Sequence, residues 1–595
     1  MRKRKDKTMS KNTSHEKGDE ILSAKMSCSC SLGKFQADVD RALQKIEENN
    51  ILSRIWSHDH TVWKDDPAEI SNRLGWLHCP EKMAGAVDQI TAFVEEVRGA
   101  GYTHALLLGM GGSSLAPEVL RCTFGVKDGY LDLTVLDSTD PGAVLEKMEE
   151  LDVSKTLYIV STKSGGTVET ASFMKFFYNE ALKRVGADKA GEHFIAITDP
   201  GSGLEATAKE LKFKKVFLND PNIGGRYSAL SYFGLVPAAL IGMDLALMLE
   251  RAAIMAQNTA SCNGTARTDN SAALLGAAMG ELAIAGRDKV TLIISPPVSY
   301  FGAWVEQLIA ESTGKEGKGI LPVSGETVRL PDKYGHDRLF VYLHLNGDDT
   351  YDASVQALRD DGRPVIQLDL RDQYDLCGEF FRWEMATVIA GMCLGINPFD
   401  QPDVESAKVL AREMVAAYHM DGKLPRLTPD FQSEGISVYS DLTANSIAEV
   451  FSKFLSLAQP GEDEAAGRSY VAVQAYIMPH PETDAALKKL QTKIQQHYRL
   501  AVTVGYGPRF LHSTGQLHKG DGGNGLFIQL TADLQKDLPI PDQAGGSTSS
   551  ISFGVLKNAQ ARGDRQALLD AGRQVIRFHL GSDIAGALRK LGAVF

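Results

Sequence analysis

The sequence predicts an α/β protein built on parallel β-sheets. From residue 104 onward, apolar runs of strand length alternate with amphipathic stretches of helical length. The runs are apolar throughout, which is typical of strands covered by helices on both faces. The chain has 595 residues, more than one hydrophobic core usually serves. We therefore expect several doubly wound units in succession.

The first predicted unit spans residues 34–265 and includes an N-terminal helical extension. A helical bridge at 229–285 follows its last strand. Residues 1–33 are rich in Lys, Ser, Asn and Glu and are predicted to be a disordered leader. The expected strands of this unit are 104–110, 133–137, 156–162, 194–199 and 215–219, and the expected helices are 142–151, 168–184 and 202–210.

Two further units are expected after the bridge. The second spans 266–425, and a stretch rich in turn-forming residues at 421–435 is interpreted as a link to a smaller C-terminal unit at 426–595. The expected strands of the second unit are 290–295, 320–324, 339–345 and 364–370. The expected strands of the third are 469–477, 500–507, 525–532 and 573–580, with helices at 482–498, 564–573 and 584–592.

Composition excludes several classes of protein. The formal net charge of −12 argues against broad binding of nucleic acid or anionic membranes. Seven scattered cysteines argue against a disulfide framework, and the Cys28/Cys30 pair, without nearby histidines, is a poor zinc pattern. The least polar stretch, 232–256, is interrupted by Pro237 and charged residues, which disfavours a membrane span. A cytoplasmic protein is expected.

Two polar motifs follow predicted strands and carry the first functional signal. GMGGSS at 109–114 and STKSGGTVET at 161–170 each place glycines and hydroxyl side chains before a predicted helix, and the second motif adds Lys163. Backbone N–H groups, hydroxyls and a cation in such a loop can surround a phosphate with hydrogen-bond donors. A tight turn or a capped helix start without ligand is the alternative for each motif. The P-loop pattern GxxxxGK[ST] is absent from both. The candidate binding residues are Gly112, Ser113, Thr162, Lys163, Ser164 and Thr167.

Two later motifs supply a cation and a carboxylate. GGRYS at 224–228 places Arg226 beside two glycines, where it could stabilise negative charge on a reacting oxygen; a surface ion pair is the alternative. Glu311 opens ESTGK after the predicted helical segment WVEQLIA. A glutamate at such a position is, taken alone, more often a solvated surface residue.

Together these motifs resemble the phosphoglucose isomerase family, whose members have two lobes built from SIS (sugar isomerase) domains. GMGGSS, TKSGGTVET, GGRYS, QLIAESTGK and NPFDQPDVESAK at 397–408 occur in the family's order. Segments 54–77 and 509–521 look most like the isomerase half of bifunctional transaldolase/phosphoglucose isomerase proteins. The resemblance implies interconversion of glucose 6-phosphate and fructose 6-phosphate without metal or cofactor, and suggests a homodimer.

The resemblance also implies a role for each matched residue. Glu311 would move a proton between C2 and C1 through a cis-enediol, and Arg226 would stabilise the charge that develops. Gln307, four residues before Glu311, would help to bind the substrate. Lys408 would assist ring opening together with a histidine. The six residues of the two polar motifs would bind the substrate and its phosphate.

The ring-opening histidine departs from the family's order. The family's histidine lies between the glutamate and the lysine, where this chain has His336 and His344 without the motif. The matching HSTGQ segment, with His512, instead follows Lys408 by about a hundred residues. His512 is our expectation, and His518 is the competing candidate.

Two other functions remain open at this point. A non-catalytic sugar-phosphate sensor would need the phosphate-binding loops but not Glu311, Arg226 and Lys408 together. A broader isomerase that also acts on mannose 6-phosphate is the second alternative, because the two substrates differ only in the orientation of one hydroxyl.

Overall fold

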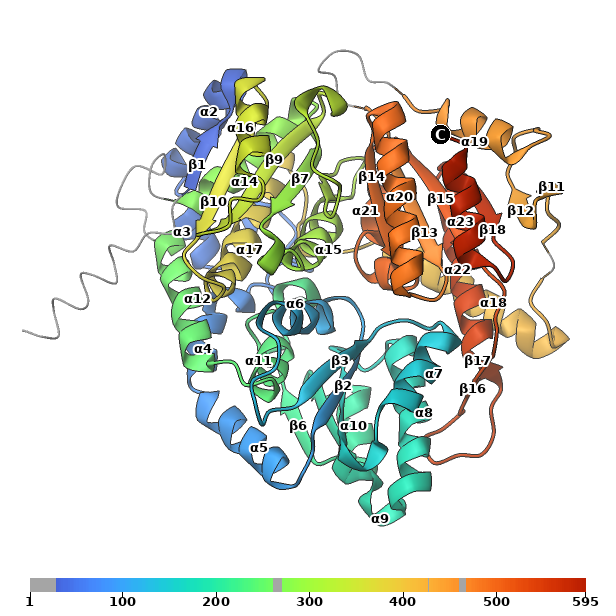
Figure 1. The fold of residues 1–595 in the computed structure, drawn as a ribbon. Helices are drawn as coiled ribbons and strands as arrows, with labels where there is room; N and C mark the ends of the chain where they lie inside the picture. Colours follow the sequence, from blue (N-terminus) through green and yellow to red (C-terminus); the bar gives the residue numbers. More distant parts are fainter. Residues whose placement is uncertain (1–27, 261–269, 426, 460–466) are drawn as a thin grey trace, which may run out of the picture.

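Three α/β units and the helices between them make up the fold (Figure 1). The structure is a computed structural model, which describes residues 28–260, 270–425, 427–459 and 467–595. The α/β class and its parallel sheets, predicted from the apolar runs, are confirmed. No helix within these ranges is both long enough and apolar enough to cross a membrane.

The first sheet is parallel throughout, in the order β3-β2-β4-β5-β6. After β2 the chain forms β3 on one side and β4 on the other, so the order reverses between β2 and β4. Ligands bind at such a point in doubly wound sheets, and both polar motifs follow these two strands. The strands are β2 (His104–Gly109), β3 (Asp132–Leu136), β4 (Thr156–Ser161), β5 (Phe194–Thr198) and β6 (Lys215–Leu218), and the helices are α5 (Val87–Gly99), α6 (Leu115–Phe124), α7 (Pro141–Glu150), α8 (Val168–Val185), α9 (Ala187–Ala190), α10 (Gly203–Glu210) and α11 (Tyr232–Leu240).

The second sheet has the order β1-β10-β9-β7-β8, with β1 antiparallel and the rest parallel. Its strands are β1 (Cys28–Ser31), β7 (Lys289–Ile294), β8 (Leu321–Val323), β9 (Arg338–Leu345) and β10 (Val365–Leu370). Its helices are α2 (Gln36–Glu48), α3 (Ile51–Trp56), α4 (Cys79–Ala84), α12 (Leu245–Ala260), α14 (Ser271–Ile284), α15 (Phe301–Thr313), α16 (Asp352–Asp360) and α17 (Asp375–Leu394).

The N-terminal segment differs from the expectation in two ways. The leader was predicted to reach residue 33, yet β1 begins at Cys28. A short polar edge strand is held by backbone hydrogen bonds to β10, which the side-chain pattern of CSCS does not reveal. The helical extension also packs away from the first sheet, because α2 lies on α14 and α3 on α12. Residues 1–27 of the predicted leader lie outside the described residues.

The C-terminal sheet has the order β11-β12-β18-β15-β13-β14, with four parallel strands and an antiparallel β11–β12 edge. Its strands are β11 (Phe431–Ser433), β12 (Ile436–Tyr439), β13 (Tyr470–Tyr476), β14 (Ala501–Tyr506), β15 (Gly525–Thr531) and β18 (Gln574–His579). Its helices are α19 (Ile447–Leu455), α20 (Pro481–Tyr498), α21 (Gly515–Gly520), α22 (Phe553–Asp570) and α23 (Ile584–Ala593). The stretch expected to link the domains therefore contains β11.

Helix α22 begins at Phe553, although the sequence pattern predicts a helix only from residue 564. The earlier half is stabilised by packing against α18 (Val404–Asp421), where a Cβ at Gly563 would lie 2.8 Å from the backbone nitrogen of Ala411. Before it, a ribbon of β16 (Pro539–Ile540) and β17 (Ile551–Ser552) leads to Phe553, whose ring lies 5.8 Å from that of Phe173 on α8. This contact docks the C-terminal unit on the first unit.

Candidate active site

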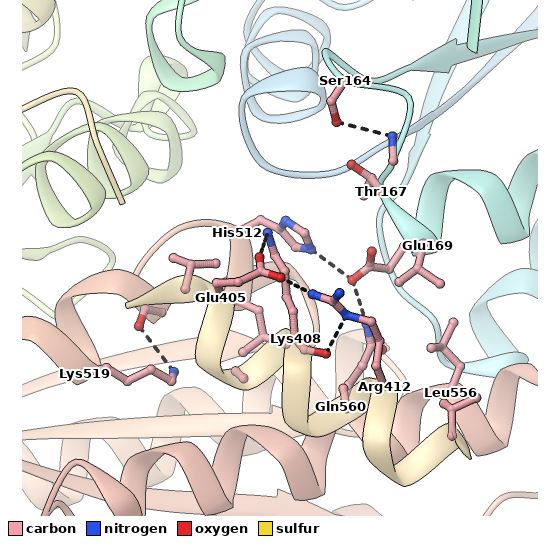
Figure 2. A pocket seen from close by; sticks show the side chains of 18 of the residues that line it. Ser164, Thr167, Glu169, Glu405, Lys408, Arg412, His512, Lys519, Leu556 and Gln560 are labelled. Carbon is pink, nitrogen blue, oxygen red and sulfur yellow. Dashed lines mark hydrogen bonds and ion pairs between the residues drawn. The ribbon is translucent and has the colours of Figure 1, made fainter. Parts of the chain in front are cut away.

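A cavity of about 460 Å³ lies where the first unit, α18 and the C-terminal unit meet (Figure 2). The first unit contributes the STKSGGTVET loop and the start of α8, while α18 and α22 form other walls. The one-turn helix Arg509–His512 and α21 close a further side. Its polar lining includes Ser164, Thr167, Glu169, Glu405, Lys408, Arg412, His512, Lys519 and Gln560.

The STKSGGTVET loop presents hydroxyls and a helix N-terminus to this cavity. Ser164 and Thr167 line it, and α8 begins immediately after Thr167, whose side chain makes no capping hydrogen bond. The first N–H groups of an 18-residue helix favour an anion. Thr162 lies beside Thr167, with 3.1 Å between their hydroxyl oxygens. Lys163 does not line the cavity, because its ammonium pairs with Asp199 and donates to the Pro221 carbonyl (2.8 Å).

The GMGGSS loop allows close backbone packing around the site and does not itself line the cavity through Gly112 or Ser113. Gly111 has φ +55°, and a Cβ there would lie 2.8 Å from the His512 carbonyl oxygen. At Gly112 a Cβ would lie 2.0 Å from the Gly225 carbonyl oxygen, so only glycine allows this approach to GGRYS. The Ser113 carbonyl accepts a hydrogen bond from Ser161, and neither Gly112 nor Ser113 lines the cavity.

Glu311, Arg226 and Gln307 form a cluster next to the cavity, in which Arg226 and Gln307 are buried and the Glu311 side chain is 13% exposed. Helix α15 continues through Glu311 to Thr313, two residues beyond it, so Gln307 and Glu311 share one face. The Gln307 amide donates to Glu311 (3.0 Å) and to the His512 carbonyl (2.8 Å), and Arg226 lies 3.3 Å from the other Glu311 oxygen. None of these three residues lines the cavity. His512 lines it, and the hydrogen bond from Gln307 to the His512 carbonyl connects the cluster to the cavity wall.

Arg226 is held on several sides, with only 3% of its surface exposed. Its guanidinium donates to Ser312, to Gln401 and to the carbonyls of Pro398 and Asp400, at 2.8–3.1 Å. Such fixed geometry is what stabilisation of developing charge requires. The next residue, Tyr227, donates to the Pro398 carbonyl and packs against Trp76.

Lys315, the last residue of ESTGK, also belongs to this cluster. It is 1% exposed, donates to the Asp400 carbonyl and lies 2.7 Å from the Asp400 carboxylate. Burial, and then the nearby charge of Arg226, lower the Lys315 pKa to about 8. Lys315 therefore supports the same loop that holds Arg226.

His512 lines the cavity and is oriented by a buried carboxylate. Its Nε2 lies 2.9 Å from Glu169 Oε1, and that oxygen also accepts from the Gln560 amide at 2.6 Å (Figure 2). Burial alone would raise the pKa of Glu169, but attraction to His512 outweighs it, so the pKa lies below the ordinary glutamate value. Gln560 in turn accepts from Thr139 (2.8 Å), which anchors α22 to the first unit.

The other histidines that the sequence left open lie elsewhere. His518 is 2% exposed inside the C-terminal unit, next to Gln474, and burial lowers its pKa well below the ordinary value. His344 pairs with Asp369 on the second sheet. Lys408, on α18, reaches the same cavity as His512; half of its side chain is exposed and it lies 3.7 Å from Glu405.

The sequence reasoning assigned no role to Glu169, Gln560 or Lys315. Two of them lie within motifs that it singled out: Glu169 in TVET, as an acid in the first turn of a helix, and Lys315 in ESTGK. A local signal therefore existed for both. Gln560 had none, because its role arises from packing of α22 against the first unit.

Known proteins that are similar to this chain include members of the phosphoglucose isomerase family. A family model described as phosphoglucose isomerase matches residues 78–326. A glucose-6-phosphate isomerase of Citrifermentans bemidjiense is 33% identical over 449 residues, covering 65% of this chain and 80% of that protein. One of Thermus thermophilus is 28% identical, covering 58% of this chain and 91% of that protein.

A solved structure supports the fold. The crystal structure of a glucose-6-phosphate isomerase from Chlamydia trachomatis superposes with a TM-score of 0.55 at 18% identity, covering 66% of this chain and 88% of that one. The family-model match spans the GMGGSS, STKSGGTVET, GGRYS and ESTGK motifs. The Citrifermentans bemidjiense relative, at 33% identity over 80% of its own length, establishes the relationship. The chain therefore belongs to the phosphoglucose isomerase family.

Proposed function

We propose that this chain interconverts glucose 6-phosphate and fructose 6-phosphate, with Glu311 as the base that carries the proton between C1 and C2. Family membership makes it a glucose-6-phosphate isomerase. The observation that carries the residue assignment is the Glu311 carboxylate, held between Arg226 and Gln307 next to a cavity whose lining includes Ser164 and Thr167.

The proposed proton transfer uses Glu311 and Arg226 in turn. Glu311 removes the proton from one carbon, and the electrons move onto the neighbouring carbonyl oxygen to give an enediol. The Arg226 guanidinium stabilises the negative charge on that oxygen. Glu311 then returns the proton to the adjacent carbon. The hydroxyl proton of the second oxygen passes to the oxygen that carried the charge, so the second oxygen becomes the new carbonyl and the molecule as a whole keeps its charge and oxidation state.

Ring opening is assigned to His512 with Lys408, since both line the cavity. His512 can pass a proton between the ring oxygen and the C1 or C2 hydroxyl, while Glu169 fixes its orientation. Ser164, Thr167 and the start of α8 would hold the phosphate, with Thr162 behind Thr167. Lys163, Gly112 and Ser113 would contribute by shaping these loops.

The direct test is the rate of isomerisation by Glu311→Gln. Removing a positioned general base should lower kcat by roughly 10²–10⁴-fold. Glu306→Gln, on the same helix, is the matched control, because burial raises the Glu306 pKa to about 7 and the amide resembles its protonated form. Glu311→Gln with a wild-type rate would refute the assignment, whereas lost turnover with retained fructose 6-phosphate binding would support it.

The two alternative functions give different results in the same experiment. A sugar-phosphate sensor would bind fructose 6-phosphate without turnover in the wild type. A broader isomerase would also convert mannose 6-phosphate, and competition kinetics between the two substrates would show it. The buried Arg226–Glu311 pair favours an enzyme, since a sensor has no use for a base held against an arginine.

Three finer assignments remain part of this proposal. Segments 54–77 and 509–521 suggest the isomerase half of a transaldolase/phosphoglucose isomerase subgroup, and the unit at 426–595 would be the part that supplies His512. Lys408 and His512 of one chain line the same cavity, and Gln307 links Glu311 to the His512 backbone, so we expect specific activity to be independent of dilution even if a homodimer forms. Sedimentation measures the oligomeric state, and activity over a dilution series tests its independence of concentration. A cytoplasmic location is expected from the substrate class.

A further inference from the structure

Three arginines converge on one face of the C-terminal sheet, outside the cavity. Arg562 and Arg565 lie on α22, and Arg577 lies on β18. Tyr439 on β12 pairs with Arg577 across the antiparallel edge, and the guanidinium lies 5.2 Å from the centre of the tyrosine ring. The two other arginines are close enough to Arg577 for their charges to lower its pKa, after burial, to about 10.

Part of this cluster's hydrogen-bonding capacity is unused. Arg577 is 5% exposed, and one of its terminal nitrogens has no partner within the described part of the chain. The Nε–H groups of Arg562 and Arg565 also lack partners there. Arg577 donates through Nε to Thr531, and Arg562 donates to the Pro425 carbonyl. Buried donors left without partners cost free energy, so their concentration at one place needs a reason.

Carboxylates do not balance the cluster. Across residues 28–260, 270–425, 427–459 and 467–595, none of the three arginines forms an ion pair. Asp430 and Asp441 are near enough to favour the charged form of Arg565, but burial outweighs them, and Asp430 accepts from the Ser440 N–H at 2.7 Å.

Several other buried arginines in the described part of the chain have a carboxylate partner. Arg338 lies 3.0 Å from Glu326, and Arg382 lies 2.9 Å from Glu379. Arg573, just before β18, lies 3.0 Å from Asp521. Pairing with a carboxylate is the usual way in which a protein accommodates a buried cation, and the three-arginine cluster has no such pair among the described residues.

We propose that Arg562, Arg565 and Arg577 form a binding site for a small oxyanion of the phosphate type. Guanidinium groups present paired N–H donors that match phosphate oxygens, and an anion would satisfy the free donors while removing the repulsion among three cations. The site is separate from the sugar-phosphate cavity, whose lining contains none of these arginines. Arg562 and Arg565 share α22 with Gln560, so bound anion would also stabilise the helix that supports Glu169.

Equilibrium dialysis against inorganic phosphate, at constant ionic strength, tests this site. Three proteins are compared with the wild type: Arg562→Gln/Arg565→Gln, a cavity variant Ser164→Ala/Thr167→Val, and a charge-matched control Arg589→Gln/Lys590→Gln on α23. We expect the arginine variant to bind one phosphate fewer per chain than the wild type. The control should bind as many as the wild type, and the cavity variant should keep the phosphate that the arginine variant loses.

The result that overturns the proposal is equal phosphate binding by the wild type and the arginine variant. Circular dichroism and isomerase activity establish that the arginine variant is folded, and the single change Arg565→Gln replaces it if the double variant is not. Loss of isomerase activity in Glu311→Gln has no bearing on this stoichiometry, so the site and the catalytic assignment fail independently. Dialysis against fructose 6-phosphate instead of phosphate shows whether the site takes free phosphate only or the phosphate group of a sugar.

Discussion

Replacing Glu169 by glutamine tests whether this carboxylate positions His512 for ring opening. One oxygen, Oε1, accepts from both His512 Nε2 (2.9 Å) and the Gln560 amide (2.6 Å). The glutamine oxygen can occupy the same place, so the geometry is largely kept and the negative charge is lost. The change therefore isolates the electrostatic part of the interaction.

The expected magnitude follows from the strengths of the two kinds of hydrogen bond. A hydrogen bond to a charged group contributes about 1.5–3 kcal/mol and a neutral one about 1 kcal/mol. The difference, roughly 0.5–2 kcal/mol, corresponds to a loss in kcat of about 2- to 30-fold. Glu169→Ala should cost more, because it also leaves the buried Gln560 amide without an acceptor.

The assay is the steady-state rate of fructose 6-phosphate conversion by Glu169→Gln, His512→Ala and the double variant. If Glu169 acts through His512, its replacement has little further effect once His512 is absent. Thermal melting checks that folding is unchanged. An equal, multiplicative loss in both backgrounds would refute the positioning role, as would a wild-type rate in the single variant.

Two further predictions concern the surrounding cluster. Gly112→Ala places a Cβ 2.0 Å from the Gly225 carbonyl oxygen and should lower the free energy of unfolding by about 1–3 kcal/mol. Gly203→Ala is the control, because no atom lies within 4 Å of the added Cβ, and it should leave the free energy of unfolding unchanged. Urea unfolding of the two variants and the wild type measures the difference. Burial lowers the Lys315 pKa to about 8 from 10.5, so its charge is present below pH 8 and lost above it. We expect the activity of the wild type to fall as pH rises through about 8. A folded Lys315→Arg variant should remain active to higher pH, because arginine keeps its charge. Identical pH–rate profiles of the wild type and this variant would contradict the prediction. Stability should change in the opposite direction, because between about pH 8 and 10.5 the unfolded chain binds this proton more tightly, so the Lys315 contribution to stability rises with pH.

Much of the fold could be predicted because its strands carry the information locally. The apolar runs at 104–110 and 339–345 correspond to β2 and β9, and both strands are buried on two faces. The edge strand β1 and the first half of α22 were missed, because partners far along the chain hold both in place. The helical segment predicted before Glu311 ended at Ala310, three residues short of the end of α15 at Thr313.

The candidate site likewise has residues that the sequence suggested and pairings that only the fold creates. The STKSGGTVET motif by itself suggested an anion-binding loop, whereas the roles expected for Arg226 and Glu311 came from the combination of motifs and its resemblance to one family. The pairing of Glu169 with His512 joins residues 343 positions apart, and the Gln307 link to the His512 backbone spans 205. Local sequence determined which groups this protein could use. Only the tertiary structure decided which of them meet, because docking the C-terminal unit against α8 brings His512 to the cavity and leaves His518 in the interior.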